Sequence, residues 1–145
     1  MYFEEFYQGQ EFHLEPFVMT LEEIQDFARR YDPQPIHIDL DYAAEGPFAG
    51  VIASGFHTLS AVWGRWIETG RFGRETLGGK GLERVEWRAP VRPGDTLKTM
   101  VRVVETRGSL NQPRGSVRLY FETKNQAGTV VMVTEGEVLI KRRSP

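Results

Sequence analysis

The spacing of apolar residues changes partway along the chain, and the first half carries helical patterns. Apolar side chains recur every three or four positions over residues 21–30, which predicts an amphipathic helix. Thr20 precedes this run and Glu23 follows three positions later, the arrangement of a capping box. Pro33 and Pro35 then end the helix, because proline cannot donate a backbone hydrogen bond. The segment 32–37 is therefore expected to be a rigid, mostly extended loop.

The most apolar helix is predicted over Ser54–Glu68, with Gly70 as its stop. Its apolar residues cover more than one face, which is typical of a buried helix. A strand interrupted by Pro16 is expected over Glu11–Met19, and a short helical turn over Asp39–Ala44.

From Gly81 onward the apolar period becomes two, which predicts strands. The segment Gly78–Gly81 before it is expected to be a flexible connection. A turn is expected at Asn125–Gly128, and short turns between successive strands favour an antiparallel sheet. The predicted strands run over 85–89, Leu97–Glu105, Ser116–Lys124 and Thr129–Lys141. One long apolar helix and a large antiparallel sheet indicate an α+β fold, most simply with the sheet wrapped around the helix.

Composition limits the classes of protein that the chain can form. Its 145 residues suit a single domain over 1–145, and a net charge of −2 disfavours a nucleic-acid partner. There is no cysteine, which excludes disulfides, thiolate catalysis and cysteine-based metal sites. No secretory signal is visible, and no apolar run is long enough to cross a membrane. We therefore expect a soluble, cytoplasmic protein.

Asp32 and His37 are the first candidates for chemistry. A carboxylate and an imidazole that share one water form an acid/base device, because histidine titrates near neutral pH. They lie five residues apart, so an extended segment must bend for them to meet. Spacing alone favours the structural alternative, in which Asp32 caps a turn and His37 packs in the loop.

The start of the apolar helix is the second candidate. Helix N-termini present free amides with a partial positive charge, and glycine lets a ligand oxygen approach the backbone. The Gly55 N–H is therefore a candidate oxyanion donor for a thioester carbonyl. Ordinary capping by Ser54 is the alternative, and both can hold together.

The remaining histidines carry weaker signals. His57 lies in the first helical turn, where the helix dipole disfavours its protonation, so a neutral packed or substrate-lining side chain is expected. His13 is interpreted as structural, and the spacing of the three histidines argues against a metal site. The segment Gly78–Gly81 lacks the Gly-Lys-Ser/Thr ending of a phosphate-binding loop.

Three blocks of sequence, in order, resemble the MaoC-like family, which includes R-specific enoyl-CoA hydratases. The first block carries Asp-x-x-Pro-Ile-His, the second leads through a Gly into the apolar helix, and the third contains Pro-Gly-Asp-x-Leu. They are Tyr31–Asp39, Phe48–Gly55 and Ala89–Leu97.

The resemblance implies a hot-dog fold and an acyl-CoA hydratase or dehydratase. Asp32 and His37 would hold the water, and the Gly55 amide would bind the thioester oxygen. The resemblance also implies a homodimer, an acyl-CoA substrate and no cofactor beyond the coenzyme A of that substrate. A hot-dog thioesterase and a non-catalytic acyl-CoA-binding module are the alternatives.

Three departures from the family pattern concern the substrate. Gln34 stands where the family usually has Asn, and Ser54 replaces the His before the oxyanion glycine. A serine that assists the pair in characterised hydratases falls at Trp63, eight residues after Gly55. The bulk of Trp63 is expected to shorten or reshape the acyl tunnel. Together with His57, these residues are the weaker candidates for lining the substrate.

Overall fold

The computed structural model describes residues 1–143. Its elements, in chain order, are the 3-10 turn η1 (Phe3–Glu5), β1 (Glu11–His13), β2 (Phe17–Val18), α1 (Leu21–Tyr31), α2 (Pro35–Ile38), α3 (Leu40–Ala44), α4 (Gly55–Glu68), β3 (Thr76–Trp87), β4 (Thr96–Gly108), β5 (Arg114–Lys124) and β6 (Val130–Lys141).

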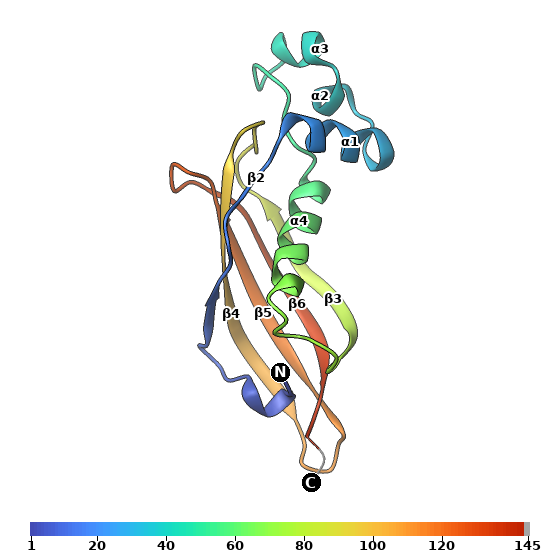
Figure 1. The fold of residues 1–145 in the computed structure, drawn as a ribbon, viewed down its shortest axis with the longest axis vertical. Helices are drawn as coiled ribbons and strands as arrows, with labels where there is room; N and C mark the ends of the chain where they lie inside the picture. The colour runs from blue at the N-terminus through green and yellow to red at the C-terminus, as the bar shows by residue number, and fades with distance from the viewer. Residues whose placement is uncertain (144–145) are drawn as a thin grey trace.

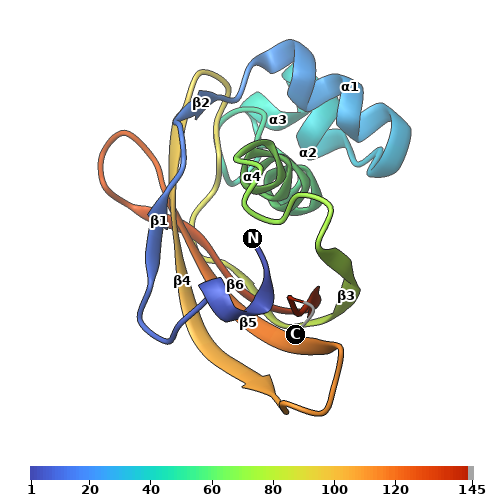
Figure 2. The ribbon, with the colours of Figure 1, turned by 60° about the horizontal axis from the view of Figure 1, so that its bottom comes forward.

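The strands form one curved antiparallel sheet in the order β1-β4-β5-β6-β3, with β2 added against β4. Helix α4 runs along the concave face of this sheet, and α1–α3 gather around its N-terminal end (Figure 1). The view in Figure 2 shows the sheet curving around α4. This is the hot-dog fold that the sequence resemblance implied, so the predicted α+β class is confirmed.

Side-chain alternation explains how the sheet buries one face. On β5, Val117, Leu119 and Phe121 are buried, whereas the residues between them are partly exposed. Trp66 of α4 is fully buried and packs edge-on against Phe121 with ring centroids 6.3 Å apart. Removing a buried aromatic ring of this kind typically costs about 3–5 kcal/mol. The contact between α4 and the sheet therefore contributes substantially to core stability.

Thr20 caps α1 as predicted, since its hydroxyl accepts a hydrogen bond from the Glu23 N–H. The predicted strand over Glu11–Met19 divides into β1 and β2, separated by the bend that contains Pro16. The expectation for Gly78–Gly81 was wrong, because these residues lie within β3 and pair with β6 through several irregular register steps. Extra residues at such bulges let a glycine-rich segment continue a strand.

Helix α4 is buried on one side only, which corrects the expectation of a helix enclosed all round. Phe56, Trp63 and Ile67 are 60%, 38% and 44% exposed. Most of β3 is exposed as well, and Leu77 and Leu82 are about half exposed. An apolar surface therefore extends over the outer side of α4 and the free edge strand β3.

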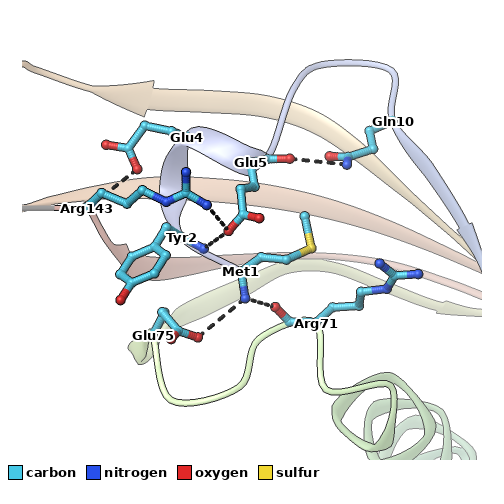
Figure 3. Close-up of polar contacts among 8 residues, drawn as sticks. All are labelled: Met1, Tyr2, Glu4, Glu5, Gln10, Arg71, Glu75 and Arg143. Atoms are coloured by element: carbon cyan, nitrogen blue, oxygen red, sulfur yellow. Dashed lines mark hydrogen bonds and ion pairs between the residues drawn. The ribbon is translucent and has the colours of Figure 1, made fainter.

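The N-terminus closes the end of the molecule opposite α1–α3. The Met1 amino group donates to the Arg71 carbonyl at 2.6 Å and lies 3.4 Å from the Glu75 carboxylate (Figure 3). These contacts tie η1 to the connection between α4 and β3. None of the described helices is long and apolar enough to cross a membrane.

Candidate active site

Asp32 and His37 meet at a helical turn, not along an extended loop. Asp32 is the C-cap of α1, with its N–H bonded to the Ala28 carbonyl at 2.8 Å. Pro35 then begins α2, because proline is well suited to the first position of a helix. The single turn of α2 brings His37 Nε2 to 3.3 Å from Asp32 Oδ2. The expected bend therefore exists, but it is helical.

Both oxygens of the Asp32 carboxylate have donors. Gln34 Nε2 donates to Oδ1 at 2.7 Å, and the Ser54 hydroxyl donates to Oδ2 at 2.7 Å. Hydrogen bonds from Gln34 and Ser54, together with the nearby His37, lower the pKa of Asp32 against the opposing effect of burial. Asp32 is therefore ionised at neutral pH. Its side chain is 17% exposed, which leaves access for a small ligand.

His37 is oriented by the backbone. Its Nδ1 lies 2.7 Å from the carbonyl oxygen of Ile52, which can only accept a hydrogen bond, so Nδ1 carries a proton. Nε2 is therefore the ring atom available to exchange a proton, and it faces Asp32. The residue is only 4% exposed, so packing limits the ring to this direction.

A cavity of about 330 Å³ begins at His37 and reaches the N-terminus of α4. Gly55 and Thr58 contribute from the helix, and Trp87 contributes from the end of β3. Among residues 1–143, no acceptor lies within hydrogen-bonding distance of the Gly55 N–H. The cavity thus brings together an imidazole with one ring nitrogen able to accept a proton and a backbone amide without an acceptor.

The indole ring of Trp87 packs so closely against residue 55 that only glycine fits there. The indole N–H donates to the Gly55 carbonyl at 3.0 Å. A Cβ added to Gly55 would overlap the indole ring itself. The glycine therefore serves close packing as well as backbone access. Trp87 is 32 residues from Gly55, and no spacing signal in the sequence connects the two, so this contact could not be predicted from the sequence.

The weaker candidates for lining the substrate, His57 and Ser54, occupy different environments in the structure. His57 is not part of the wall of the His37 cavity; its ring stacks on Phe27 of α1 with centroids 4.8 Å apart. Burial lowers the pKa of His57 against the charge of Glu23, so the ring is neutral at neutral pH. Ser54 is at the N-cap of α4, but its side chain makes no capping bond and instead contacts Asp32.

A second cavity of about 490 Å³ lies further along the same face of α4. Leu59 and Trp63 line it from the helix, and Phe121 lines it from the sheet. Gly79 and Gly136, which lack side chains, widen the opposite wall. Trp63 therefore lines an apolar space beyond the catalytic candidates and does not contact them.

Hydrogen bonds at the Pro93–Asp95 turn, outside the cavity, stabilise the loop that leads into α4. Asp95 accepts from the Arg92 N–H at 2.9 Å and from the Gln126 side chain at 2.9 Å. The Arg92 guanidinium donates to the Phe48 carbonyl at 2.6 Å and thereby holds the loop before α4. Within residues 1–143, no three His, Asp or Glu side chains gather closely enough to bind a metal ion.

Comparisons with known proteins agree with this architecture. A profile of the MaoC like domain matches residues 5–125. The uncharacterized protein YdeM of Bacillus subtilis is 35% identical over 142 residues, which cover 98% of this chain and all of the relative. The chain therefore belongs to the MaoC-like dehydratase family.

Two solved structures are similar over nearly the whole chain. The MaoC-like dehydratase from Rhodospirillum rubrum has a TM-score of 0.90 and 29% identity, covering 100% of this chain and 99% of the other. The R-hydratase PhaJ1 from Pseudomonas aeruginosa has a TM-score of 0.77 and 27% identity, covering 98% of this chain and 86% of the other. Membership of this family supports hydratase or dehydratase chemistry in general.

Proposed function

We propose that the protein adds water to, or removes it from, the 2,3 double bond of an enoyl-CoA. The observation that carries this proposal is the 3.3 Å approach of His37 Nε2 to Asp32 Oδ2 in a site that also contains the free Gly55 amide. An acid/base pair and an oxyanion donor are the two parts that conjugate addition to a thioester needs.

The proposed reaction uses each group for one task. Water is held between Asp32 and His37, and its oxygen bonds to C3 of the substrate. The thioester oxygen accepts from the Gly55 N–H, which stabilises the enolate that forms. The proton released by the water is transferred through the pair to C2, so both residues end as they began. The reverse sequence removes water from a 3-hydroxyacyl-CoA.

The second cavity is proposed to hold the acyl chain. Gly55 and Thr58 border the first cavity, whereas Leu59 and Trp63 border the second, so both lie along one side of α4. A thioester bound at Gly55 can therefore direct its acyl chain towards Trp63. Because the lining there is mainly apolar, an aliphatic chain suits it better than a polar one.

A homodimer is proposed for the apolar surface on β3 and α4. The free edge of β3 can pair with the same strand of a second copy, which would also cover Leu77. A two-fold interface of this kind uses one patch on both subunits. Sedimentation equilibrium should give twice the chain mass, and a monomer over the whole concentration range would contradict the proposal.

The activity test uses enoyl-CoAs of different length and branching. Loss of the conjugated double bond and release of free CoA are followed separately. Asp32→Asn and His37→Ala should each lower the hydration rate by about 10²–10⁴-fold. Asp26→Asn and His13→Ala are the matched controls, because both side chains are largely exposed and lie outside the site.

Each outcome decides between the proposed function and its alternatives. Hydration that survives both site substitutions contradicts the mechanism. CoA release without hydration favours a thioesterase, and tight binding with neither reaction favours a non-catalytic binding module.

A further inference from the structure

Ser54 uses its hydroxyl in an unusual way for a helix N-cap residue. Serine is favoured at this position because its oxygen normally accepts from an amide of the first turn. In α4 no such bond forms, and the fully buried hydroxyl instead donates to Asp32 Oδ2 at 2.7 Å. The hydroxyl proton of Ser54, the one hydrogen-bond donor of this side chain, is thus committed to a residue 22 positions earlier in the chain.

This choice leaves the start of α4 uncapped. Among residues 1–143, neither the Gly55 N–H nor the Phe56 N–H has an acceptor within hydrogen-bonding distance. Free amides at a helix N-terminus attract a negatively polarised oxygen. The same serine therefore holds the carboxylate of Asp32 on one side and leaves the neighbouring amides free on the other.

We infer that Ser54 is a positioning residue that fixes the Asp32 carboxylate relative to the Gly55 amide, so that one substrate can contact both groups. This inference rests on the proposed function. Asp32 lies between α1 and α2, whereas Gly55 begins α4, and the Ser54 hydroxyl joins these segments directly. In this proposal the thioester oxygen contacts the Gly55 amide while Asp32 contacts the water that adds to C3.

Gln34 completes the support of the carboxylate. Its side-chain amide donates to Oδ1 at 2.7 Å, so Asp32 is held through both oxygens by neutral donors. A carboxylate fixed in this way has little freedom to rotate. Misplacement of a catalytic group by about 1 Å can lower a rate by about 10²-fold.

The first test needs no substrate. The Asp32 carboxyl group is titrated by carbon NMR in the wild type and in Ser54→Ala, with Asp32→Asn used to assign the signal. Loss of a donor to the charged form should raise the Asp32 pKa by about one pH unit. Ser54→Cys tests the same loss with a nearly isosteric side chain, should the alanine variant fold poorly. Ser54→Thr keeps the hydroxyl and should preserve the low value.

Thr20→Ala is the matched control for capping. Thr20 is also a helix N-cap, but its hydroxyl caps α1 and does not contact the site. Its loss should lower thermal stability without changing the titration of Asp32. An Asp32 titration in Ser54→Ala and Ser54→Cys that equals the wild type would overturn the inference.

The second test measures hydration. Ser54→Ala should lower kcat about 10²-fold with little change in KM, and should move the acidic limb of the pH–rate profile to higher pH. Ser54→Thr should recover most of the rate. A rate and profile unchanged in Ser54→Ala would reject the positioning role. If the wild type hydrates none of the enoyl-CoAs, the proposed function fails, whereas the titration still decides whether Ser54 controls Asp32.

Discussion

Trp87 donates its indole N–H to the Gly55 carbonyl at 3.0 Å, and its ring occupies the space that a Cβ at residue 55 would need. The end of β3 thus holds the first turn of α4 in place. Trp87, which is partly exposed and lies outside the recognised motif, therefore contacts the turn that carries the candidate oxyanion donor.

Gly55→Ala should therefore damage both stability and activity. The new methyl group must displace the indole of Trp87, and overpacking of this kind typically costs about 1–3 kcal/mol. Hydration should fall by at least about 10²-fold, since the amide moves with the turn. The double variant Gly55→Ala/Trp87→Ala removes the clash, so its loss of stability should be less than the sum of the single losses, as measured by chemical denaturation.

Gly64→Ala is the control on the same helix. An added Cβ at Gly64 meets no atom within 4 Å, so alanine should stabilise α4 by about 0.5–1 kcal/mol. Equal behaviour of the two alanine variants would contradict the role of Trp87.

The lowered pKa of Asp32 predicts a specific acid sensitivity. A carboxyl group whose pKa is lower in the folded state stabilises the fold above its unfolded value, near 3.8, and loses that contribution as pH falls through the folded value. Asp32→Asn should remove this component, so its free energy of unfolding should vary less with pH below about 4. Unfolding measured by circular dichroism from neutral to acidic pH checks this, with Asp26→Asn expected to resemble the wild type.

Gln34→Leu should also change the titration of Asp32. The substitution removes the donor to Oδ1, which is the largest cause of the lowered pKa. The acidic limb of the hydration profile should therefore move to higher pH while the basic limb stays in place. Gln34→Glu instead places a second carboxylate beside Asp32, and mutual repulsion should raise the pKa further. A profile that moves in neither variant would show that Asp32 does not control this limb.

The width of the second cavity predicts chain-length preference. Trp63→Ala should enlarge the space and raise kcat/KM for longer or branched enoyl-CoAs relative to short ones. Gly79→Leu should do the opposite, because Gly79 lines the cavity beside its β6 neighbour Val138 and a leucine side chain there would occupy part of the space. Competition assays with paired substrates measure the ratio directly. Preferences that change in the same direction in both variants would place the acyl chain elsewhere.

Most helices and strands of the fold could be predicted from local signals in the sequence. The capping of α1 by Thr20, the alternation of β5 and the apolar pattern of α4 each depend on neighbours within a few residues. The strand character of Gly78–Gly81 was missed because it comes from pairing with β6, a partner about sixty residues later. Propensity says little about a segment whose hydrogen bonds depend on tertiary structure.

Some features of the candidate site could likewise be predicted from the sequence, whereas others depend on tertiary contacts. Asp32 and His37 could be identified because they lie close together in the sequence and belong to a recognisable block. The Ser54–Asp32 bond and the contact of Trp87 with Gly55 join distant segments, so spacing could not reveal them. His57 also shows that a histidine near a motif can face away from the cavity, since its ring packs on Phe27.

Helix α4 borders both cavities along one side, so the spacing of residues along it can limit the length of the acyl chain that the protein accepts. Gly55 and Trp63 are eight residues apart, which corresponds to about 12 Å of helical rise. If the thioester is fixed at Gly55, the position of the bulky Trp63 side chain on this face sets how far an acyl chain extends. Moving that bulk by one helical turn would change the measured length by about 5 Å, without altering the catalytic end.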